Sequence, residues 1–273
     1  MKILVIGGGG REHALCWKLA QEAEVICAPG NAGIAETCRV EAVDPSDHSV
    51  VVILAKNEAV DFVVVGPEDP LIAGLADTLR AEGVPVVGPG RDGAALEGSK
   101  AFSKRMMVEA GVQTARGGEF KSPDIAKAFA AEFFAGGSGV AVKASGAALG
   151  IGVVVCSELG QAMDAIDQMM VDKVFGEAGE TVVIEEALIG QEFSLLTLVS
   201  GTSYRSLPVS QDYKRALDGD HGPNTGGMGT YSPVGWLENS VIEETERTVV
   251  EPLLELMAGK GIDFRGCLLY TSD

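Results

Sequence analysis

Runs of apolar residues alternate with amphipathic segments over the first hundred residues of the chain. The apolar runs have the length of buried strands, and the segments between them place apolar residues at helical spacing. The run at 46–57 is also compatible with a strand, but its position between two strands favours a helix. Strands that alternate with helices predict a small doubly wound parallel sheet of the α/β class, with ligands at the carboxyl ends of the strands. The predicted strands lie in 2–7, 24–30, 61–71 and 84–90, and the other predicted helices lie in 11–21 and 71–83.

The pattern changes after a helix predicted at 99–111. Strand-like runs now follow one another across short turns with helices interspersed, which indicates an α+β unit with antiparallel pairing. Near the end of the chain, Ser240 and Glu243 have the spacing of a capping box at the start of a long helix. The predicted strands here are 139–144, 152–156, 181–188 and 193–201, the helices are 124–136 and 158–171, and 263–273 begins a further strand.

The composition limits the partners that this protein can have. The 39 acidic and 21 basic side chains give a net charge of -18, which repels nucleic acid and anionic membranes, so an anionic substrate needs local cations. The five cysteines form no C-x-x-C pair and no zinc pattern with the three histidines, which favours buried thiols in a reducing cytosol. No apolar run has the length of a membrane span, and a strand that begins at Lys2 leaves no room for a signal peptide. We therefore expect a cytoplasmic protein with no membrane or nucleic-acid partner.

The glycine-rich turn at 7–10 starts like a dinucleotide-binding fingerprint but does not complete it. Gly7 and Gly9 fit the first two positions, whereas the bulky Glu12 occupies the third. The second strand ends in Ala-Pro-Gly-Asn and lacks the acid that holds a ribose. Two interpretations stay open: a backbone anion site to which Arg11 adds charge, or a tight turn between a strand and a helix.

Other catalytic patterns are incomplete. The segment 93–100 has the Ser and Lys of a P-loop in the wrong order and follows no clear strand. The chain has no G-x-S-x-G motif, and His13, His48 and His221 lie too far apart to suggest a nucleophile and its base. These observations argue against a P-loop enzyme and a triad hydrolase.

Three later stretches combine charge with small residues. A strand delivers Lys143 into a loop of small residues, which can fold over phosphate oxygens or form a hairpin with a solvated lysine. At 185–192, acidic residues follow a strand whose edge can bind an adenine through its backbone, although they can also be simply solvated. The span 210–233 sets cations among glycines, and its anchoring side chains Met228 and Tyr231 favour a binding loop over a disordered linker.

Taken together, these stretches resemble the ATP-grasp superfamily and, within it, the phosphoribosylamine–glycine ligase family, from residue 1 to about 265. The most specific motifs are SQDYKR and GPNTGGMGTYSP. The resemblance implies a Rossmann-like, substrate-binding domain at 1–99 and an incomplete ATP-grasp domain at 100–273, with a lid subdomain at about 118–190. It also implies the ligation of glycine to 5-phosphoribosylamine through glycyl phosphate, with ATP and Mg²⁺ or Mn²⁺.

The same resemblance implies roles for individual residues. Lys143 and Arg215 would be catalytic through positioning and charge neutralisation, without a covalent nucleophile. ATP would be bound by Lys100 and Lys143 at the phosphates, by the adenine hinge Glu185, Glu186, Ala187 and Leu188, by Glu192 at the ribose, and by Gly150. The substrates would be bound by Gly9, Gly10, Arg11, Asn31, Glu68, Asp212, Lys214, Arg215 and Asn224.

The chain departs from the family pattern in three respects. Ser145 and Ile151 stand where the family usually has Asp and Lys, and the second change removes a cation from the lid. The family's metal ligands, a Glu and an Asn, lie beyond residue 273, so we expect no metal site, an inactive fragment and an exposed sheet edge that lowers solubility. Residues 267–273 leave the family pattern, and both foreign sequence and ordinary truncation stay open as explanations.

Two alternative functions also stay open. One is another ATP-grasp ligase or carboxylase, against which SQDYKR followed by PNTGGMG argues. The other is a non-catalytic nucleotide-binding module, which Ile151 and the missing metal ligands favour. In each case we expect small-molecule ligands and favour a monomer.

Overall fold

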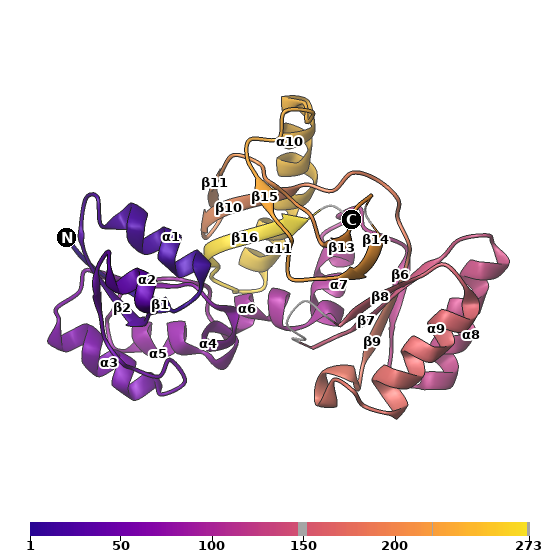
Figure 1. Cartoon of the computed structure of the whole chain (residues 1–273), viewed down its shortest axis with the longest axis horizontal. Coiled ribbons are helices and arrows are strands. Elements are labelled where there is room, and N and C mark those ends of the chain that lie inside the picture. Colours follow the sequence, from indigo (N-terminus) through magenta and orange to yellow (C-terminus); the bar gives the residue numbers. More distant parts are fainter. Residues whose placement is uncertain (147–151, 220, 272–273) are drawn as a thin grey trace. The chain divides into compact units, whose positions relative to one another are not determined.

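The computed structural model describes residues 1–146, 152–219 and 221–271 (Figure 1). The chain divides into two compact units. The first consists of Met1–Ala95, Leu198–Tyr204 and Met257–Cys267, and the second of Leu96–Thr197, Arg205–Leu256 and Leu268–Asp273. Each unit has its own sheet and core.

The first unit contains a five-stranded parallel sheet in the order β3-β2-β1-β4-β5. The central strand β1 pairs Ile3 with Val25 of β2 and with Phe62 of β4. This parallel sheet confirms the predicted α/β class. Its strands are β1 (Lys2–Gly7), β2 (Glu24–Pro29), β3 (Arg39–Val40), β4 (Phe62–Val65) and β5 (Val86–Val87).

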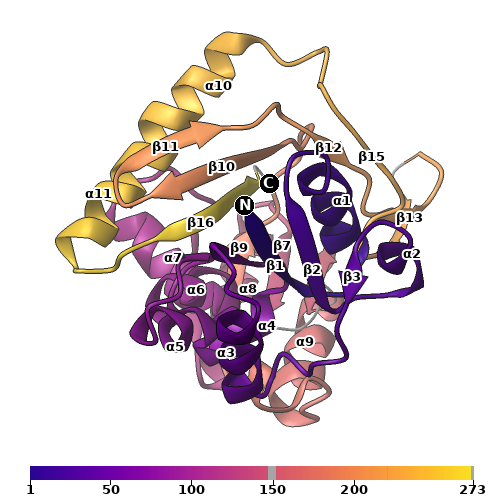
Figure 2. The same cartoon turned by 90° about the vertical axis from the view of Figure 1, so that its left-hand side faces the viewer.

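Helices cover both faces of this sheet, as expected for a doubly wound fold (Figure 2). One face packs against α1 and α2 through a core that includes Ile3, Cys16 and Ile34. The other face packs against α3, α4 and α5 through a core that includes Leu4 and Leu79. The helices are α1 (Gly10–Leu19), α2 (Ala32–Ala35), α3 (His48–Asn57), α4 (Glu68–Ala73), α5 (Leu75–Ala81) and α6 (Arg91–Gly98).

In the first unit, one predicted helix is confirmed by its cap and another is divided in two by a glycine. The segment 46–57 is a helix because Asp47 caps it, accepting hydrogen bonds from the backbone N–H groups of Ser49 and Val50. The single helix predicted at 71–83 is wrong. Gly74 adopts a left-handed φ of 95°, which ends α4 and starts α5.

The second unit is built on a four-stranded antiparallel sheet in the order β6-β9-β7-β8, which confirms the predicted antiparallel pairing. Helices α8 and α9 lie side by side against it (Figure 1), and Phe133, Ile166 and Ile184 belong to their shared core. The strands are β6 (Gly117–Phe120), β7 (Val140–Ala144), β8 (Val153–Cys156) and β9 (Val182–Glu186). The helices are α7 (Lys100–Glu109), α8 (Pro123–Ala135) and α9 (Leu159–Ile166), the last followed by the turns η1 (Asp167–Val171) and η2 (Gly176–Gly179).

The span 210–233 forms two short pairs of strands. Strand β12 pairs with β15, and β13 pairs with β14, both antiparallel. A further three-stranded sheet has the order β11-β10-β16. These strands are β10 (Ser194–Ser200), β11 (Ser203–Ser206), β12 (Gln211–Asp212), β13 (Arg215–Leu217), β14 (His221–Asn224), β15 (Thr230–Tyr231) and β16 (Arg265–Thr271).

The predicted capping box at Ser240 is wrong. Helix α10 (Asn239–Thr245) has Glu238 as its N-cap, so Ser240 already lies in the first turn. Its hydroxyl donates instead to the Glu238 carboxylate at 3.2 Å. The helix continues through η3 (Glu246–Val250) into α11 (Glu251–Gly259). Within the part of the chain that is described, no helix combines the length and the apolar character needed to cross a membrane.

The buried side chain of Glu12 shapes the turn after β1. Only 4% of this residue is exposed, and its Oε2 accepts a hydrogen bond of 2.6 Å from the backbone N–H of Gly9. A Cβ atom on Gly7 would lie 2.6 Å from Cγ of Glu12, and one on Gly66 would collide with its carboxylate. Gly7, at the end of β1, and Gly66, after β4, therefore leave room for the side chain of Glu12.

We expect Gly66→Ala to lower the free energy of unfolding by about 1–3 kcal/mol, because the added methyl group overpacks the buried carboxylate. Thermal or urea unfolding measures this change. Gly10→Ala is the matched control, since a Cβ there meets no atom within 4 Å and alanine is favoured in a helix. Equal stability of the two variants would contradict this packing argument.

Candidate functional site

A cleft of about 1590 Å³ opens in the second unit. Its volume exceeds the roughly 300–1,000 Å³ typical of small-molecule sites, so it has room for more than one ligand. It is bordered by α7, the strands β7, β8 and β9, the connection after β9, and the span that contains β12 and β13. The predicted site residues that line it are Lys100, Lys143, Glu185, Glu186, Ala187, Leu188, Glu192, Asp212, Lys214 and Arg215.

The carboxylate of Glu185 lies between two lysines at the base of this cleft. Lys104 Nζ from α7 is 2.7 Å from Glu185 Oε1, and Lys143 Nζ from β7 is 2.7 Å from Glu185 Oε2. The side chains of Lys104 and Glu185 are 9% exposed and that of Lys143 is 16% exposed. These charges are therefore largely removed from water and depend on one another.

Charge and burial act in opposite directions on the site's titratable groups. Burial raises the pKa of Glu185, but the nearby Lys143 and Lys104 outweigh it and hold the pKa below its ordinary value. The pKa of Lys100 is lowered, mainly by burial and also by Lys143, against an opposing effect of Glu97. The carboxylate thus stays ionised, whereas Lys100 holds its proton less firmly than a surface lysine.

The start of α7 is tied to the end of β7 by Ser145. The backbone N–H of Lys100 donates to the Ser145 carbonyl at 2.8 Å, and that of Ala101 donates to the Ser145 hydroxyl at 3.1 Å. The next N–H, of Phe102, donates to the capping hydroxyl of Ser99 at 3.2 Å. Lys100 Nζ reaches the carbonyl of Gly146 at 3.4 Å. Ser145 therefore joins Lys100 to the predicted phosphate loop, whose Gly150 and Ile151 lie outside the described residues.

Two backbone N–H groups of the predicted adenine hinge already donate hydrogen bonds within the protein. The N–H of Glu186 donates to the Arg116 carbonyl at 2.9 Å, and the N–H of Ala187 donates to the Gly139 carbonyl at 3.0 Å. The Glu186 side chain accepts from the Arg116 N–H at 2.8 Å. These two N–H groups are committed within the fold, whereas Leu188 lines the cleft with 49% exposure.

The far side of the cleft carries the residues of the span 210–233. Lys214 Nζ lies 3.1 Å from the Glu192 carboxylate, so a predicted substrate residue and the predicted ribose residue are ion-paired. Arg215 donates to the Gly222 carbonyl at 2.9 Å and pairs with Asn224 in the β13–β14 register. Asp212 lies in β12 opposite Thr230. The fold therefore brings three of the predicted substrate residues, Asp212, Lys214 and Arg215, to the same cleft as the predicted nucleotide residues.

The remaining predicted residues form a separate group in the first unit. Arg11 lies 3.7 Å from the Glu68 carboxylate and also donates to the Gly66 carbonyl. The side chain of Asn31 donates to the Gly8 carbonyl at 2.8 Å and accepts from the N–H of Ile34 at 2.9 Å. Gly9 and Gly10, at the start of α1, belong to the same turn, although the N–H of Gly9 is committed to Glu12. These groups all follow the carboxyl ends of β1, β2 and β4.

Lys104, the second partner of Glu185, is not among the site residues predicted from the sequence. A signal was present, because Lys104 follows Lys100 by one helical turn and so shares its face of α7. Also not predicted is a polar aromatic group at the rim, in which Tyr231 Oη and Trp236 Nε1 both donate to the Gln211 side chain, at 2.6 and 3.1 Å. Nothing in the linear spacing indicates that contact.

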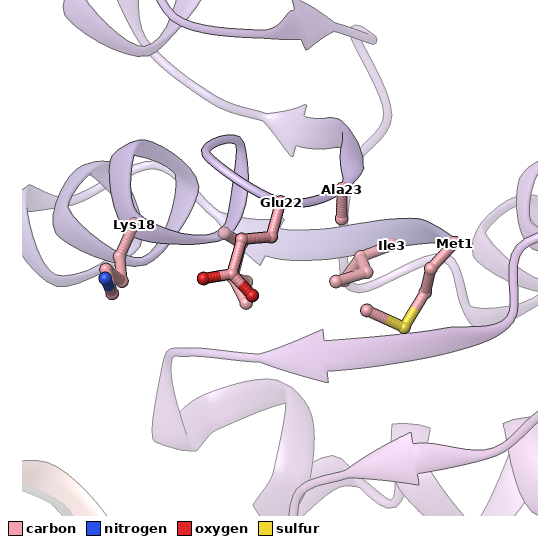
Figure 3. A pocket seen from close by; sticks show the side chains of 6 residues that line it. Met1, Ile3, Lys18, Glu22 and Ala23 are labelled. Atoms are coloured by element: carbon pink, nitrogen blue, oxygen red, sulfur yellow. The ribbon is translucent and has the colours of Figure 1, made fainter.

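A second pocket lies beside the beginning of β1 and the end of α1 (Figure 3). It is lined by residues such as Met1, Ile3 and Lys18 and has a volume of about 120 Å³. This is well below the size of a nucleotide site, and it is at the end of the parallel strands opposite to the one that binds ligands. In residues 1–146, 152–219 and 221–271, no group of three or more His, Cys, Asp or Glu side chains could hold a metal ion.

The antiparallel sheet with its buried lysines and the preceding parallel-sheet unit define an ATP-grasp type of protein, and comparison with known proteins agrees. The model of the phosphoribosylglycinamide synthetase N domain matches residues 1–97, and that of the ATP-grasp (A) domain matches residues 98–272. The chain therefore belongs to the phosphoribosylglycinamide synthetase family.

Individual relatives support this assignment. The phosphoribosylamine–glycine ligase of Xanthomonas campestris is 47% identical over 98% of this chain, and that of Streptomyces coelicolor is 46% identical over 99%. The crystal structure of phosphoribosylamine–glycine ligase from Thermotoga maritima matches 99% of this chain and 65% of its own, with 29% identity and a TM-score of 0.84. The biotin carboxylase domain of Hydrogenobacter thermophilus 2-oxoglutarate carboxylase shares the fold, with 20% identity and a TM-score of 0.73 over all of this chain and 61% of its own. The chain spans 63% and 62% of the length of the two ligases.

We expect Glu185→Gln to lower the free energy of unfolding by about 3–5 kcal/mol at pH 7, because it leaves two lysines at a largely buried position without their carboxylate. The folded pKa of Glu185 is lower than the unfolded one, so its ionised form stabilises the fold above the unfolded pKa of about 4.3. The stability difference between wild type and variant should therefore shrink as the pH falls through the folded pKa. Urea unfolding between pH 7 and pH 3 measures it.

Glu119→Gln is the control for this experiment, because Glu119 forms an ion pair with Arg105 that is exposed to solvent. We expect Glu119→Gln to lower the free energy of unfolding by less than about 1 kcal/mol at any pH. A Glu185→Gln variant no less stable than this control would show that the buried pairs do not hold the site together.

Proposed function

We propose that the protein to which this chain belongs ligates glycine to 5-phosphoribosylamine at the expense of ATP. The products are glycinamide ribonucleotide, ADP and phosphate, formed by way of glycyl phosphate. The observation that carries the proposal is the grouping of Lys100, Lys143 and Glu185 with Asp212, Lys214 and Arg215 around one cleft. The family match over both parts of the chain and the names of its relatives support it.

In this proposal ATP takes the side of the cleft formed by α7, β7 and the end of β9. Lys100 and Lys143 neutralise the phosphates, the segment 186–188 receives the adenine, and Glu192 accepts hydrogen bonds from the ribose. Positioning and charge neutralisation account for most phosphoryl transfer catalysis, so no covalent nucleophile is required. That a related fold is described with bound ADP and magnesium supports this placement of the nucleotide.

In this proposal, glycine binds beside Arg215 and the sugar phosphate of phosphoribosylamine binds at the strand ends of the first unit. The glycine carboxylate needs a cation near the transferring phosphate, which Arg215 supplies, with Lys214 and Asp212 beside it. The sugar phosphate needs an anion site, for which Gly10, Arg11 and Asn31 at the strand ends of the first unit are suited. The amine then attacks the acyl phosphate carbon and phosphate leaves.

Magnesium or manganese would neutralise the phosphate oxygens in such a reaction. Among the described residues, no group of three or more His, Cys, Asp or Glu side chains could hold such an ion by itself. The chemistry assigned to this chain is therefore limited to binding and orientation by its own cations, carboxylates and backbone groups.

The test is ADP formation by the protein extended to the length of its relatives. We expect ADP only when glycine and phosphoribosylamine are both present, together with a product of the mass of glycinamide ribonucleotide. Omission of either substrate, and replacement of glycine by bicarbonate, are the controls. ADP formation with bicarbonate alone or with another acid and amine would overturn the substrate assignment and favour a different ATP-grasp activity.

We expect Arg11→Ala to raise the KM for phosphoribosylamine about tenfold and to leave the KM for ATP within about twofold, because it removes a cation from the proposed sugar-phosphate site only. Steady-state kinetics with each substrate varied measures the two constants. Arg105→Ala, which also removes an exposed arginine from an ion pair with a glutamate, is the matched control. An equal effect on both KM values would argue against this placement of the phosphate.

A further inference from the structure

The two lysines that flank Glu185 differ in what else they contact. Lys104 Nζ is 2.7 Å from Glu185 Oε1 and 3.2 Å from Thr114 Oγ1, and it also donates to the Ala115 carbonyl. An ammonium group has three N–H donors, so all three donors of Lys104 have partners within the protein. Lys104 therefore has no donor left for a ligand, although it borders the cleft.

Lys143 is placed differently. It lies on β7, directly before the predicted phosphate loop, and pairs with the other oxygen of Glu185, Oε2, at 2.7 Å. It is also somewhat more exposed than Lys104, at 16% against 9%. A phosphate in the cleft would compete with Glu185 for this ammonium group.

Such competition would be costly if Glu185 had no second partner. A carboxylate that is largely buried and loses its counter-charge is strongly destabilised in its ionised form or takes up a proton. The charged groups that face it are Lys104 from α7 and Lys143 from β7. Strand β6 presents only Gly117, where a Cβ would lie 2.7 Å from Cγ of Glu185.

We infer that Lys104 is a positioning residue, which keeps the Glu185 carboxylate ionised and in place while Lys143 moves its interaction to a phosphate of a bound nucleoside triphosphate. This inference rests on the proposed ATP site. It assigns the two lysines distinct roles, Lys143 in contact with the ligand and Lys104 acting only through Glu185.

Removal of Lys104 should therefore change binding in a particular way. In Lys104→Met the Glu185 carboxylate keeps Lys143 as its ammonium partner but has lost Lys104, so the move of Lys143 toward ATP removes the stabilisation of a largely buried carboxylate. We expect the Kd for ATP to rise about tenfold at pH 8. As Lys143 leaves, Glu185 should take up a proton, so the affinity recovers as the pH falls toward 6.

The experiment is titration calorimetry of the natural full-length protein with ATP and magnesium, in buffers of different ionisation enthalpy between pH 6 and pH 8. The wild type is expected to show only the proton exchange of the nucleotide itself. Lys104→Met should show additional proton uptake, whereas Lys104→Arg, which keeps the charge, should resemble the wild type. A purely structural role would lower the melting temperature without changing the proton uptake.

Lys127→Met is the matched control, because Lys127 on α8 forms an ion pair of 2.6 Å with Asp167 and does not border the cleft. We expect its Kd to stay within about twofold of the wild type. In the Glu185→Gln background, the effect of Lys104→Met on proton uptake should vanish, since the titrating group is gone.

Two results would overturn the inference, one of them without and the other together with the proposed function. Wild-type affinity and proton uptake in Lys104→Met would refute the role of Lys104 while the ATP site stands. Absence of ATP binding by the folded wild type would refute the proposed function and this inference with it. If Lys104→Met does not fold, extra proton uptake in Lys104→Arg would by itself contradict the inference.

Discussion

The candidate cleft depends on the contact between one carboxylate and two ammonium groups. Glu185 joins β9 to α7 through Lys104 and to β7 through Lys143. Each charge is tolerated away from water only because the others are present, so the three elements are held in one arrangement. The same contact places Lys143 beside the cleft with a defined orientation. A structural ion pair and the proposed phosphate-binding group Lys143 are thus parts of one network.

This network also answers a question raised by the net charge of -18. An acidic protein that binds an anion must concentrate its cations, and five of them, Lys100, Lys104, Lys143, Lys214 and Arg215, line one cleft. Each is oriented by a carboxylate or a carbonyl oxygen of the protein. The carboxylates and carbonyl oxygens of the protein therefore orient these cations toward one cleft.

Packing accounts for two departures from expected motifs, at Glu12 and at Ser145. At the third position of the dinucleotide fingerprint, Glu12 is accommodated because Gly7 and Gly66 leave space for it, and it satisfies the N–H of Gly9. At the position where the family usually has Asp, Ser145 still accepts the N–H of Ala101 at the start of α7. In both cases a polar side chain takes over a hydrogen bond that the backbone requires.

The sequence by itself determined the features that depend on neighbouring residues: the apolar runs of the two sheets, the helix capped by Asp47, and the motifs around Lys143 and 210–233. It could not show that Ser240 lies inside the first turn of α10 rather than at its N-cap, because the helix begins at Asn239. Only the tertiary structure decided that Lys104 forms an ion pair with Glu185 and Lys214 one with Glu192. It also decided that Gln211 accepts hydrogen bonds from Tyr231 and Trp236. These side chains lie on elements distant along the chain, and linear spacing carries no information about which of them meet when sheets and helices pack.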